Sequence, residues 1–144
     1  MTDVFTKHST FTLERRYPAP PAKVFAAWSD PEAKAAWFAT PGGQHSLDFR
    51  VGGQEVNAAR GLVFTAEYHD IVPGERLVYS GTMRSPAGII TTISVTTIEL
   101  ESDGDGTHLV LTEQGTYLDG HEDPSWRVQG TGDWLDQLGA YLAG

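Results

Sequence analysis

The sequence contains no cysteine among its 144 residues. Disulfide scaffolds, thiolate metal sites and cysteine nucleophiles are therefore excluded, and this composition fits a cytoplasmic protein. No apolar run approaches the ~20 residues that a membrane helix needs. The N-terminus lacks the basic-then-apolar pattern of a signal peptide. We therefore expect a cytoplasmic protein without a membrane span.

Basic residues are also scarce. Ten Lys and Arg stand against 19 Asp and Glu, which gives a formal net charge of −9. A nucleic-acid binder needs a basic surface, so that class of function is excluded. Residues 99–144 hold ten acidic residues and a single basic one, Arg127, and so carry the whole −9. We interpret this acidic third as a solvated face, with docking of a basic partner as the alternative.

The length and composition are typical of one globular domain. With 40% hydrophobic and 20% charged residues, the chain can bury one core. No internal repeat, low-complexity tract or long linker divides the sequence. We predict a single domain over residues 1–144, in which the polar residues 1–9 form a flexible tail.

Hydrophobic periodicity predicts the order of the secondary structure. Alternation with period two indicates strands, and apolar residues three and four positions apart indicate helices. Prolines and glycines mark the turns, most clearly at residues 102–106. In chain order we expect a strand over 10–17, helices over 21–29 and 31–37, strands over 45–51, 54–60, 62–72, 76–83, 89–100 and 107–115, and a closing helix from 124 to 141 or 142.

An antiparallel meander of this kind buries one face, and the simplest arrangement curls the sheet around the closing helix. Gly130, Gly132 and Gly139 lie inside that helix, where each costs about 1 kcal/mol relative to alanine. They indicate a kink, or a close approach of the helix backbone to the sheet or to a ligand. The predicted fold class is α+β, with six to seven strands in one curved antiparallel sheet.

Several short motifs follow this order of elements. In this order they resemble the START-like helix-grip superfamily, also called SRPBCC, over about residues 9–143. Within it they resemble the AHSA-like branch, the homologues of a heat-shock-protein ATPase activator, which is related to polyketide cyclase-like proteins. The motifs are RRYPAP (15–20), VFAAWSDPE (24–32), AWF (36–38), DFRVGG (48–53), EYHDIVP (67–73), RLVY (76–79), GTG (130–132) and LDQL (135–138).

The resemblance implies a helix-grip fold, with two short helices after the first strand and the sheet wrapped around a long C-terminal helix. It also implies an internal cavity between sheet and helix for a small hydrophobic molecule, aromatic or lipid-like, without a cofactor. Related proteins include cyclase-like enzymes and a co-chaperone domain. A homodimer or a chaperone partner therefore stays open beside the small-molecule partner.

Bulky flat side chains are the candidate lining of that cavity. Together they offer more surface than one helix and one sheet face normally need, and their polar tips could orient a ligand. We predict a pocket of about 300–1,000 Å³, with a solid core as the alternative. The candidate ligand-binding residues are Trp37, Phe38, Phe49, Phe64, Tyr79, Met83, Trp126 and Trp134, together with Glu113.

Glu113 is the candidate chemical group. It continues the face of Leu109 and Leu111, so strict alternation points it inward, where its pKa rises or it acquires a cationic partner. With Tyr117 it is the candidate acid–base pair of a cyclase- or hydrolase-type enzyme, the alternative to simple binding. The structural alternative is a solvated strand-end carboxylate, or one paired with Arg84 or Arg15.

The remaining polar motifs have structural explanations. Asp48 and Arg50 share a strand face and can pair on the solvent side, although Arg50 could instead face a ligand. The five histidines lack metal-ligand spacing, so we expect no metal site.

Overall fold

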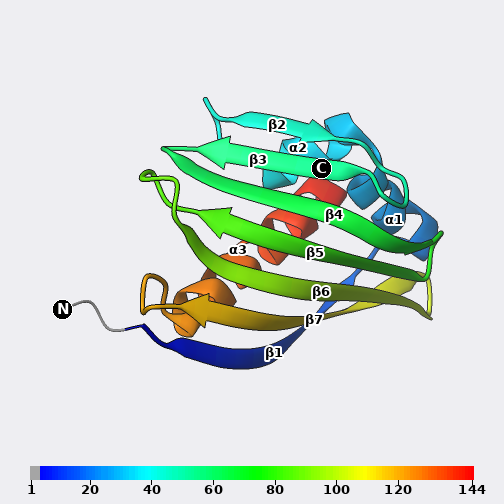
Figure 1. The fold of residues 1–144 in the computed structure, drawn as a ribbon. Coiled ribbons are helices and arrows are strands. Elements are labelled where there is room, and N and C mark those ends of the chain that lie inside the picture. Colours follow the sequence, from blue (N-terminus) through cyan, green and yellow to red (C-terminus); the bar gives the residue numbers. More distant parts are fainter. Residues whose placement is uncertain (1–3) are drawn as a thin grey trace.

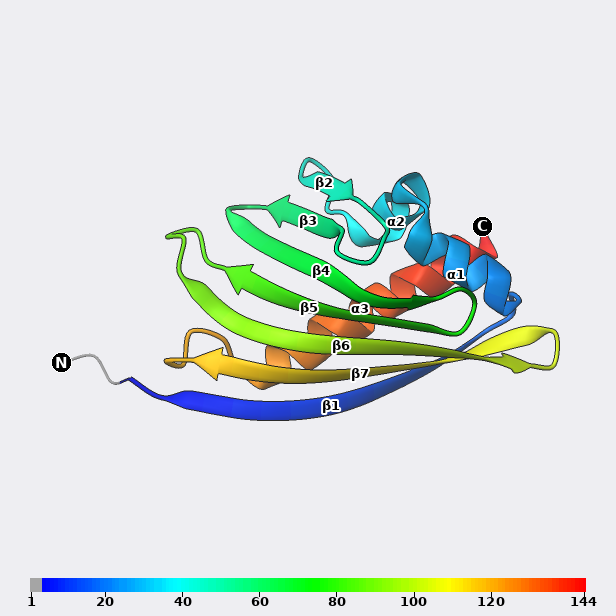
Figure 2. The same cartoon turned by 45° about the vertical axis from the view of Figure 1, so that its right-hand side comes forward.

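Ten elements account for most of residues 4–144, which the computed structural model describes. The strands are β1 (Thr6–Tyr17), β2 (Gln44–Leu47), β3 (Gln54–Ala59), β4 (Leu62–Val72), β5 (Arg76–Arg84), β6 (Ile90–Asp103) and β7 (Gly106–Leu118), and the helices are α1 (Pro21–Ser29), α2 (Pro31–Phe38) and α3 (Pro124–Ala143). Within the described residues, seven strands form one antiparallel sheet in the order β1-β7-β6-β5-β4-β3-β2. The sheet curves around α3, while α1 and α2 lie at one end (Figures 1 and 2). The predicted α+β helix-grip architecture is confirmed.

The first strand begins earlier than predicted. Thr6 pairs with Leu118 and Ser9 with Gly115, so this stretch belongs to β1. The prediction of a flexible tail is wrong for these residues, because β7 runs on to Leu118 and supplies their backbone hydrogen-bond partners. The rest of the predicted tail includes residues 1–3, which lie outside the described residues.

The second strand is shorter than predicted. β2 ends at Leu47, and the chain then forms a compact turn in which the Asp48 amide donates to the Gln54 carbonyl at 2.9 Å. Gly52 has a φ of 84°, which favours glycine at that position. Arg50 Nε donates to Asp48 Oδ2 at 2.8 Å on the exposed surface. The predicted pairing is therefore confirmed, although it is formed within the turn and not on a strand face.

Inward-facing leucines join α3 to the sheet. Leu109 and Leu111 of β7 and Leu135 and Leu138 of α3 are all buried. The Tyr17 hydroxyl donates to the Leu135 carbonyl at 2.7 Å and ties β1 to the helix. The predicted register of α3, with Leu138 in the core, is therefore confirmed.

Two glycines allow α3 to approach β1 closely. A Cβ atom at Gly132 would lie 3.3 Å from Nη2 of Arg15, and one at Gly139 would lie 3.3 Å from the Tyr17 ring. At Gly130 a Cβ atom would meet nothing within 4 Å. Contact with β1 therefore explains two of the three glycines.

Within residues 4–144, no helix combines the length and apolar composition needed to cross a membrane.

Candidate functional site

A small cavity lies between α3 and the concave face of the sheet. Its volume is about 30 Å³, which is room for one or two water molecules. The predicted volume of about 300–1,000 Å³ is therefore wrong for this structure. The cavity is lined by Trp28, Trp37, Phe38, Phe64, Tyr79, Leu111, Glu113, Arg127, Thr131, Trp134 and Leu135.

Interlocking aromatic rings fill the space that was predicted to be open. The ring centroids of Trp28 and Trp37 are 4.8 Å apart, and those of Phe38 and Trp134 are 4.5 Å apart. Trp37 also meets Phe38 edge-on at 5.7 Å. These contacts run from α1 through α2 to α3, so the rings serve mainly as core packing.

The predicted ligand-binding residues divide into three groups. Met83 lines a neighbouring pocket of about 100 Å³. Phe49 instead packs its ring 5.1 Å from Tyr68, and Trp126 is 65% exposed, so neither lines the cavity. Phe49 packs against the core away from the cavity, beside Phe25 and Tyr68, whereas Trp126 lies on the solvent face of α3. The residues that do line it are Trp37, Phe38, Phe64, Tyr79, Glu113 and Trp134.

Two side chains separate the cavity from its neighbour. The second pocket is lined by Thr40, Asn57, Ala59, Leu62, Phe64, Met83 and Trp134. Phe64 and Trp134 line both spaces. Trp134 is partly buried, and its indole, with the Phe64 ring, lies where the inner cavity and the neighbouring pocket adjoin.

Glu113 faces inward, as the alternation predicted. It is 5% exposed, and its Oε1 accepts a hydrogen bond from the Thr96 hydroxyl at 3.0 Å. Burial raises the pKa of Glu113 above its ordinary value of 4.5, and the nearby Arg127 and Thr96 offset this only in part. The expectation of a solvated strand-end carboxylate is thereby overturned.

The cationic partner of Glu113 is Arg127, rather than Arg84 or Arg15. Arg127 lies in the first turns of α3 and is 7% exposed. Its Nε atom lies 3.7 Å from Glu113 Oε2 and 3.1 Å from Glu122 Oε2. Arg15 is committed elsewhere, because its Nε pairs with Asp136 at 2.9 Å. One guanidinium is therefore shared between two carboxylates.

Two polar atoms of this group have no hydrogen-bond partner within the described part of the chain. They are Glu113 Oε2 and Arg127 Nη2, and both are fully buried. Both residues line the small cavity. Trp28, which lines the same cavity, adds a third such atom, its Nε1 donor. The cavity therefore combines aromatic walls with one carboxyl oxygen, one cationic donor and one indole donor that lack partners.

The tyrosines near Glu113 remain protonated at neutral pH. Burial raises the pKa of Tyr79, which lines the cavity, and the charge of Glu113 raises it further. Burial likewise raises the pKa of Tyr117 to about 12. Tyr117 is buried but lies outside the cavity lining. Of the two tyrosines, Tyr79 is the one placed beside the space that Glu113 faces.

A second buried polar cluster was not predicted from the sequence. Lys34 Nζ lies 2.9 Å from Glu55 Oε1, and each side chain is 1% exposed. Glu55 also accepts a hydrogen bond from the Tyr68 hydroxyl at 2.7 Å, and its Oε2 lies 2.7 Å from His45 Nε2. This cluster fixes α2, β2, β3 and β4 to one another behind the aromatic rings.

The surroundings of this cluster favour its ionised form. The Lys34 ammonium lies over the rings of Trp28, Trp37 and Phe38, at 4.8, 5.5 and 4.4 Å from their centroids. Burial raises the pKa of Glu55, but the charge of Lys34 and the hydrogen bonds outweigh it and lower that pKa to about 2. Burial lowers the pKa of Lys34, and Glu55 opposes that shift.

The sequence did carry a signal for this cluster. Lys34 precedes Trp37 and Phe38 by three and four positions, which places it on their face of the helix. Pairing across the turn at residues 60–61 sets Glu55 opposite Ala66 and Asn57 opposite Phe64, so β3 directs its polar residues inward.

Within residues 4–144, no group of three or more His, Cys, Asp or Glu residues could hold a metal ion.

Comparison with known proteins identifies the relatives of this chain. Residues 18–143 match the family described as activator of Hsp90 ATPase homolog 1-like protein. The chain belongs to this family. No curated protein matches the sequence.

Several solved structures are similar to this chain, and two of them match nearly its whole length. An uncharacterised protein from Rhizobium leguminosarum is 41% identical, with a TM-score of 0.91 over 99% of each chain. The Mll3558 protein from Rhizobium loti is 40% identical, with a TM-score of 0.89 over 95% of this chain and 99% of the other. An HSP90 activator from Plasmodium falciparum is 21% identical, with a TM-score of 0.58 over 72% and 71%, and shows likeness of fold alone.

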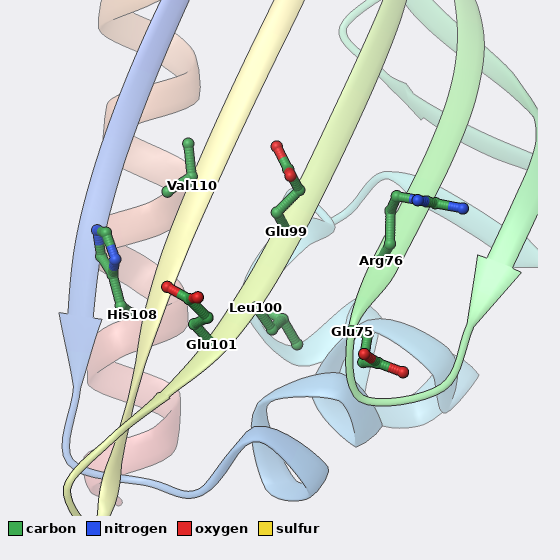
Figure 3. Close-up of a pocket in the computed structure, with 7 residues that line it drawn as sticks. All are labelled: Glu75, Arg76, Glu99, Leu100, Glu101, His108 and Val110. Carbon is green, nitrogen blue, oxygen red and sulfur yellow. The ribbon is translucent and has the colours of Figure 1, made fainter.

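A second hollow lies on the outer surface of the sheet. A groove of about 370 Å³ on the convex side of the sheet contains the carboxylates of Glu75, Glu99 and Glu101, beside His108 and Arg76 (Figure 3). The other acidic residues of 99–144 are not gathered there. Two face the interior, and others lie on α3, so the predicted acidic face is divided among several surfaces.

Proposed function

We propose that this protein binds a small molecule with a flat apolar body in the space between α3 and the sheet, with the ligand's polar end against Glu113 and Arg127. The observation that supports this most strongly is the pair of unpartnered polar atoms, Glu113 Oε2 and Arg127 Nη2. Leaving a buried polar atom unpaired costs about 1–3 kcal/mol, and more for a charged group. No side chain of the described residues pairs with these two atoms, so both are available to a ligand, which would be stabilised by pairing with them.

Trp134 acts as the gate in this proposal. Its indole separates the inner cavity of about 30 Å³ from the outer pocket of about 100 Å³. Rotation of this one side chain joins the two spaces without moving α3. The ligand then takes the place of the indole against Phe38 and Phe64. Closed molecules cannot bind, so the apparent affinity is proportional to the fraction of molecules that are open.

The experiment compares two tryptophans of α3. Binding of 2-naphthol to wild type, Trp134→Ala and Trp126→Ala is followed by protein fluorescence and by stopped flow. We expect Trp134→Ala to bind 2-naphthol faster than wild type and about tenfold more tightly. A tenfold gain corresponds to the removal of a closed state that is favoured by about 1.4 kcal/mol. Trp126 is 65% exposed and outside the lining, so Trp126→Ala should match wild type. Equal kinetics in all three proteins would refute the gate, and absence of binding in all three would refute the proposed function.

A second candidate is contact with an Hsp90-type chaperone through the outer groove. The supporting observation is the gathering of Glu75, Glu99 and Glu101 in the largest of the hollows described here (Figure 3), on a chain of the activator family. The test measures the ATPase rate of an Hsp90 with and without this protein at low and high salt. We expect salt-sensitive stimulation that is lost in the double variant Glu99→Gln, Glu101→Gln. No effect of the wild-type protein would eliminate this candidate.

A further inference from the structure

We infer that the ligand carries a second polar group at its other end, a neutral hydrogen-bond donor such as a hydroxyl, and that Asn57 Oδ1 accepts its hydrogen bond. This inference rests on the proposed function and specifies the ligand class for the same site. It follows from the polar atoms of the outer pocket of about 100 Å³, which shares Trp134 with the inner cavity.

Asn57 is a buried amide of which one end is already bound. The residue is 8% exposed, and its Nδ2 donates to the Phe38 carbonyl at 3.2 Å, which joins β3 to the C-terminal end of α2. This bond fixes the orientation of the amide, because the reversed orientation would place two acceptor oxygens against each other. The atom without a partner in the described part of the chain is therefore Oδ1, which can only accept.

The position of Asn57 on β3 places it at the outer pocket. It pairs with Phe64 of β4, and both residues line that pocket together with Trp134. The Trp134 ring also packs 4.5 Å from the ring of Phe38, whose carbonyl Asn57 holds. The indole that must move for a ligand to enter therefore lines the same pocket as the amide that would receive the ligand's second polar group.

The outer pocket excludes a charged group at this end of the ligand. None of the described residues that line it carries a charge; they are Thr40, Asn57, Ala59, Leu62, Phe64, Met83 and Trp134. An ammonium or a carboxylate would have no counter-ion there, and burial of an unpaired charge is costly.

The free oxygen of Asn57 decides between a neutral donor and a neutral acceptor. An ether or carbonyl oxygen placed on Oδ1 would set acceptor against acceptor, whereas a hydroxyl can donate to it. The Thr40 hydroxyl, the other polar side-chain group of this lining, can donate or accept and so excludes neither. The group that pairs with Asn57 is therefore a neutral donor.

The inner end of the same ligand meets a different set of free atoms. Trp28 Nε1 and Arg127 Nη2 can only donate, whereas Glu113 Oε2 accepts when ionised and can donate when protonated. A carbonyl oxygen can therefore pair with the inner donors in either protonation state of Glu113. The two ends of the site thus differ, so a ligand with a carbonyl at one end and a hydroxyl at the other should bind in one orientation.

The experiment uses three ketones that share one ring system and differ at a single position. 2-Acetylnaphthalene, its 6-hydroxy derivative and its 6-methoxy derivative are titrated calorimetrically into wild type, Asn57→Leu and Gln54→Leu at pH 7. We expect wild type to bind the hydroxy ketone about fivefold more tightly than 2-acetylnaphthalene, as one neutral hydrogen bond gives. The methoxy oxygen can only accept, so the methoxy ketone should bind no more tightly than 2-acetylnaphthalene.

The variants separate this hydrogen bond from a general change of structure. Asn57→Leu also removes the bond to the Phe38 carbonyl, which would weaken the binding of all three ketones together. The ratio between the hydroxy ketone and 2-acetylnaphthalene should nevertheless fall to about one, because the ratio isolates the contact of the hydroxyl. Gln54 is exposed on the same strand, so Gln54→Leu should keep the ratio of wild type.

The outcomes distinguish this inference from the proposed function. Equal affinities for the hydroxy ketone and 2-acetylnaphthalene in wild type, or a ratio that survives Asn57→Leu, would overturn the inference while leaving the binding site in place. No binding of any of the three ketones, in wild type and in Trp134→Ala, would overturn both. The comparison in wild type needs no variant, so the inference remains testable even if Asn57→Leu fails to fold.

Discussion

Replacement of Glu55 by glutamine should cost stability in a pH-dependent way. The substitution leaves the Lys34 ammonium buried without a counter-ion, although its side chain is 1% exposed. Removal of one partner of a buried ion pair costs about 3–5 kcal/mol. At neutral pH we therefore expect the free energy of unfolding of Glu55→Gln to fall by that amount.

The pH dependence follows from the pKa of Glu55. Folding lowers that pKa from 4.5 to about 2. A carboxyl with a depressed pKa contributes stability above its unfolded pKa and loses it as pH falls toward the folded value. Between pH 4.5 and 3 the wild type should lose about 2 kcal/mol from this group. Glutamine does not titrate, so the difference between wild type and variant should shrink by the same amount.

Urea unfolding followed by tryptophan fluorescence at pH 7, 5, 4 and 3 measures this effect. Glu67→Gln, which removes a carboxylate exposed on β4, is the matched control, and its curve should parallel that of wild type. The double variant Lys34→Met, Glu55→Leu should recover only part of the loss, because apolar side chains can replace the ion pair but leave the Tyr68 hydroxyl and His45 Nε2 without their partner. A constant difference between wild type and Glu55→Gln from pH 7 to 3 would refute the assigned role of Glu55.

Three further predictions concern the core. Leu138→Ala should destabilise the protein by about 2–5 kcal/mol in urea unfolding, because Leu138 is fully buried; a loss within about 0.5 kcal/mol would contradict its place in the core. Tyr17→Phe removes the hydroxyl that donates to the Leu135 carbonyl and should cost about 0.5–1.5 kcal/mol by the same method. The raised pKa of Glu113 means that its stabilising protonated form is complete below pH 4.5 and is lost as pH rises through the folded pKa. Wild type should therefore lose stability relative to Glu113→Gln between pH 4 and 8, and parallel curves would rule this out.

Sequence patterns predicted the positions that alternation or helical spacing fixes. Glu113 follows Leu109 and Leu111 on a strand paired on both sides, so its inward direction could be read directly. The same reasoning placed Leu138 correctly, because α3 has one continuous buried stripe. Trp126 was misplaced because the buried stripe of α3 begins at Arg127, which leaves Trp126 on the solvent face of the same turn.

The sequence could not give the size of the cavity or the partner of Glu113. The cavity depends on how the rings of Trp28, Trp37, Phe38 and Trp134 fit together in three dimensions, which their spacing along the chain does not specify. Arg127 stood out only as the single basic residue among ten acidic ones. Its pairing with Glu113 depends on the direction in which α3 crosses the sheet.

The attachments of α3 have a consequence for how the molecule loosens. Its N-terminal half is tied to β7 by Arg127 and Glu113, and its C-terminal half is tied to β1 by Tyr17 with Leu135 and by Arg15 with Asp136. These two sets of contacts are independent of each other, since they involve different strands. Weakening the first should therefore fray only the leading turns of the helix. Amide hydrogen exchange in an Arg127→Met variant should accelerate over residues 124–133 and remain slow over 135–142.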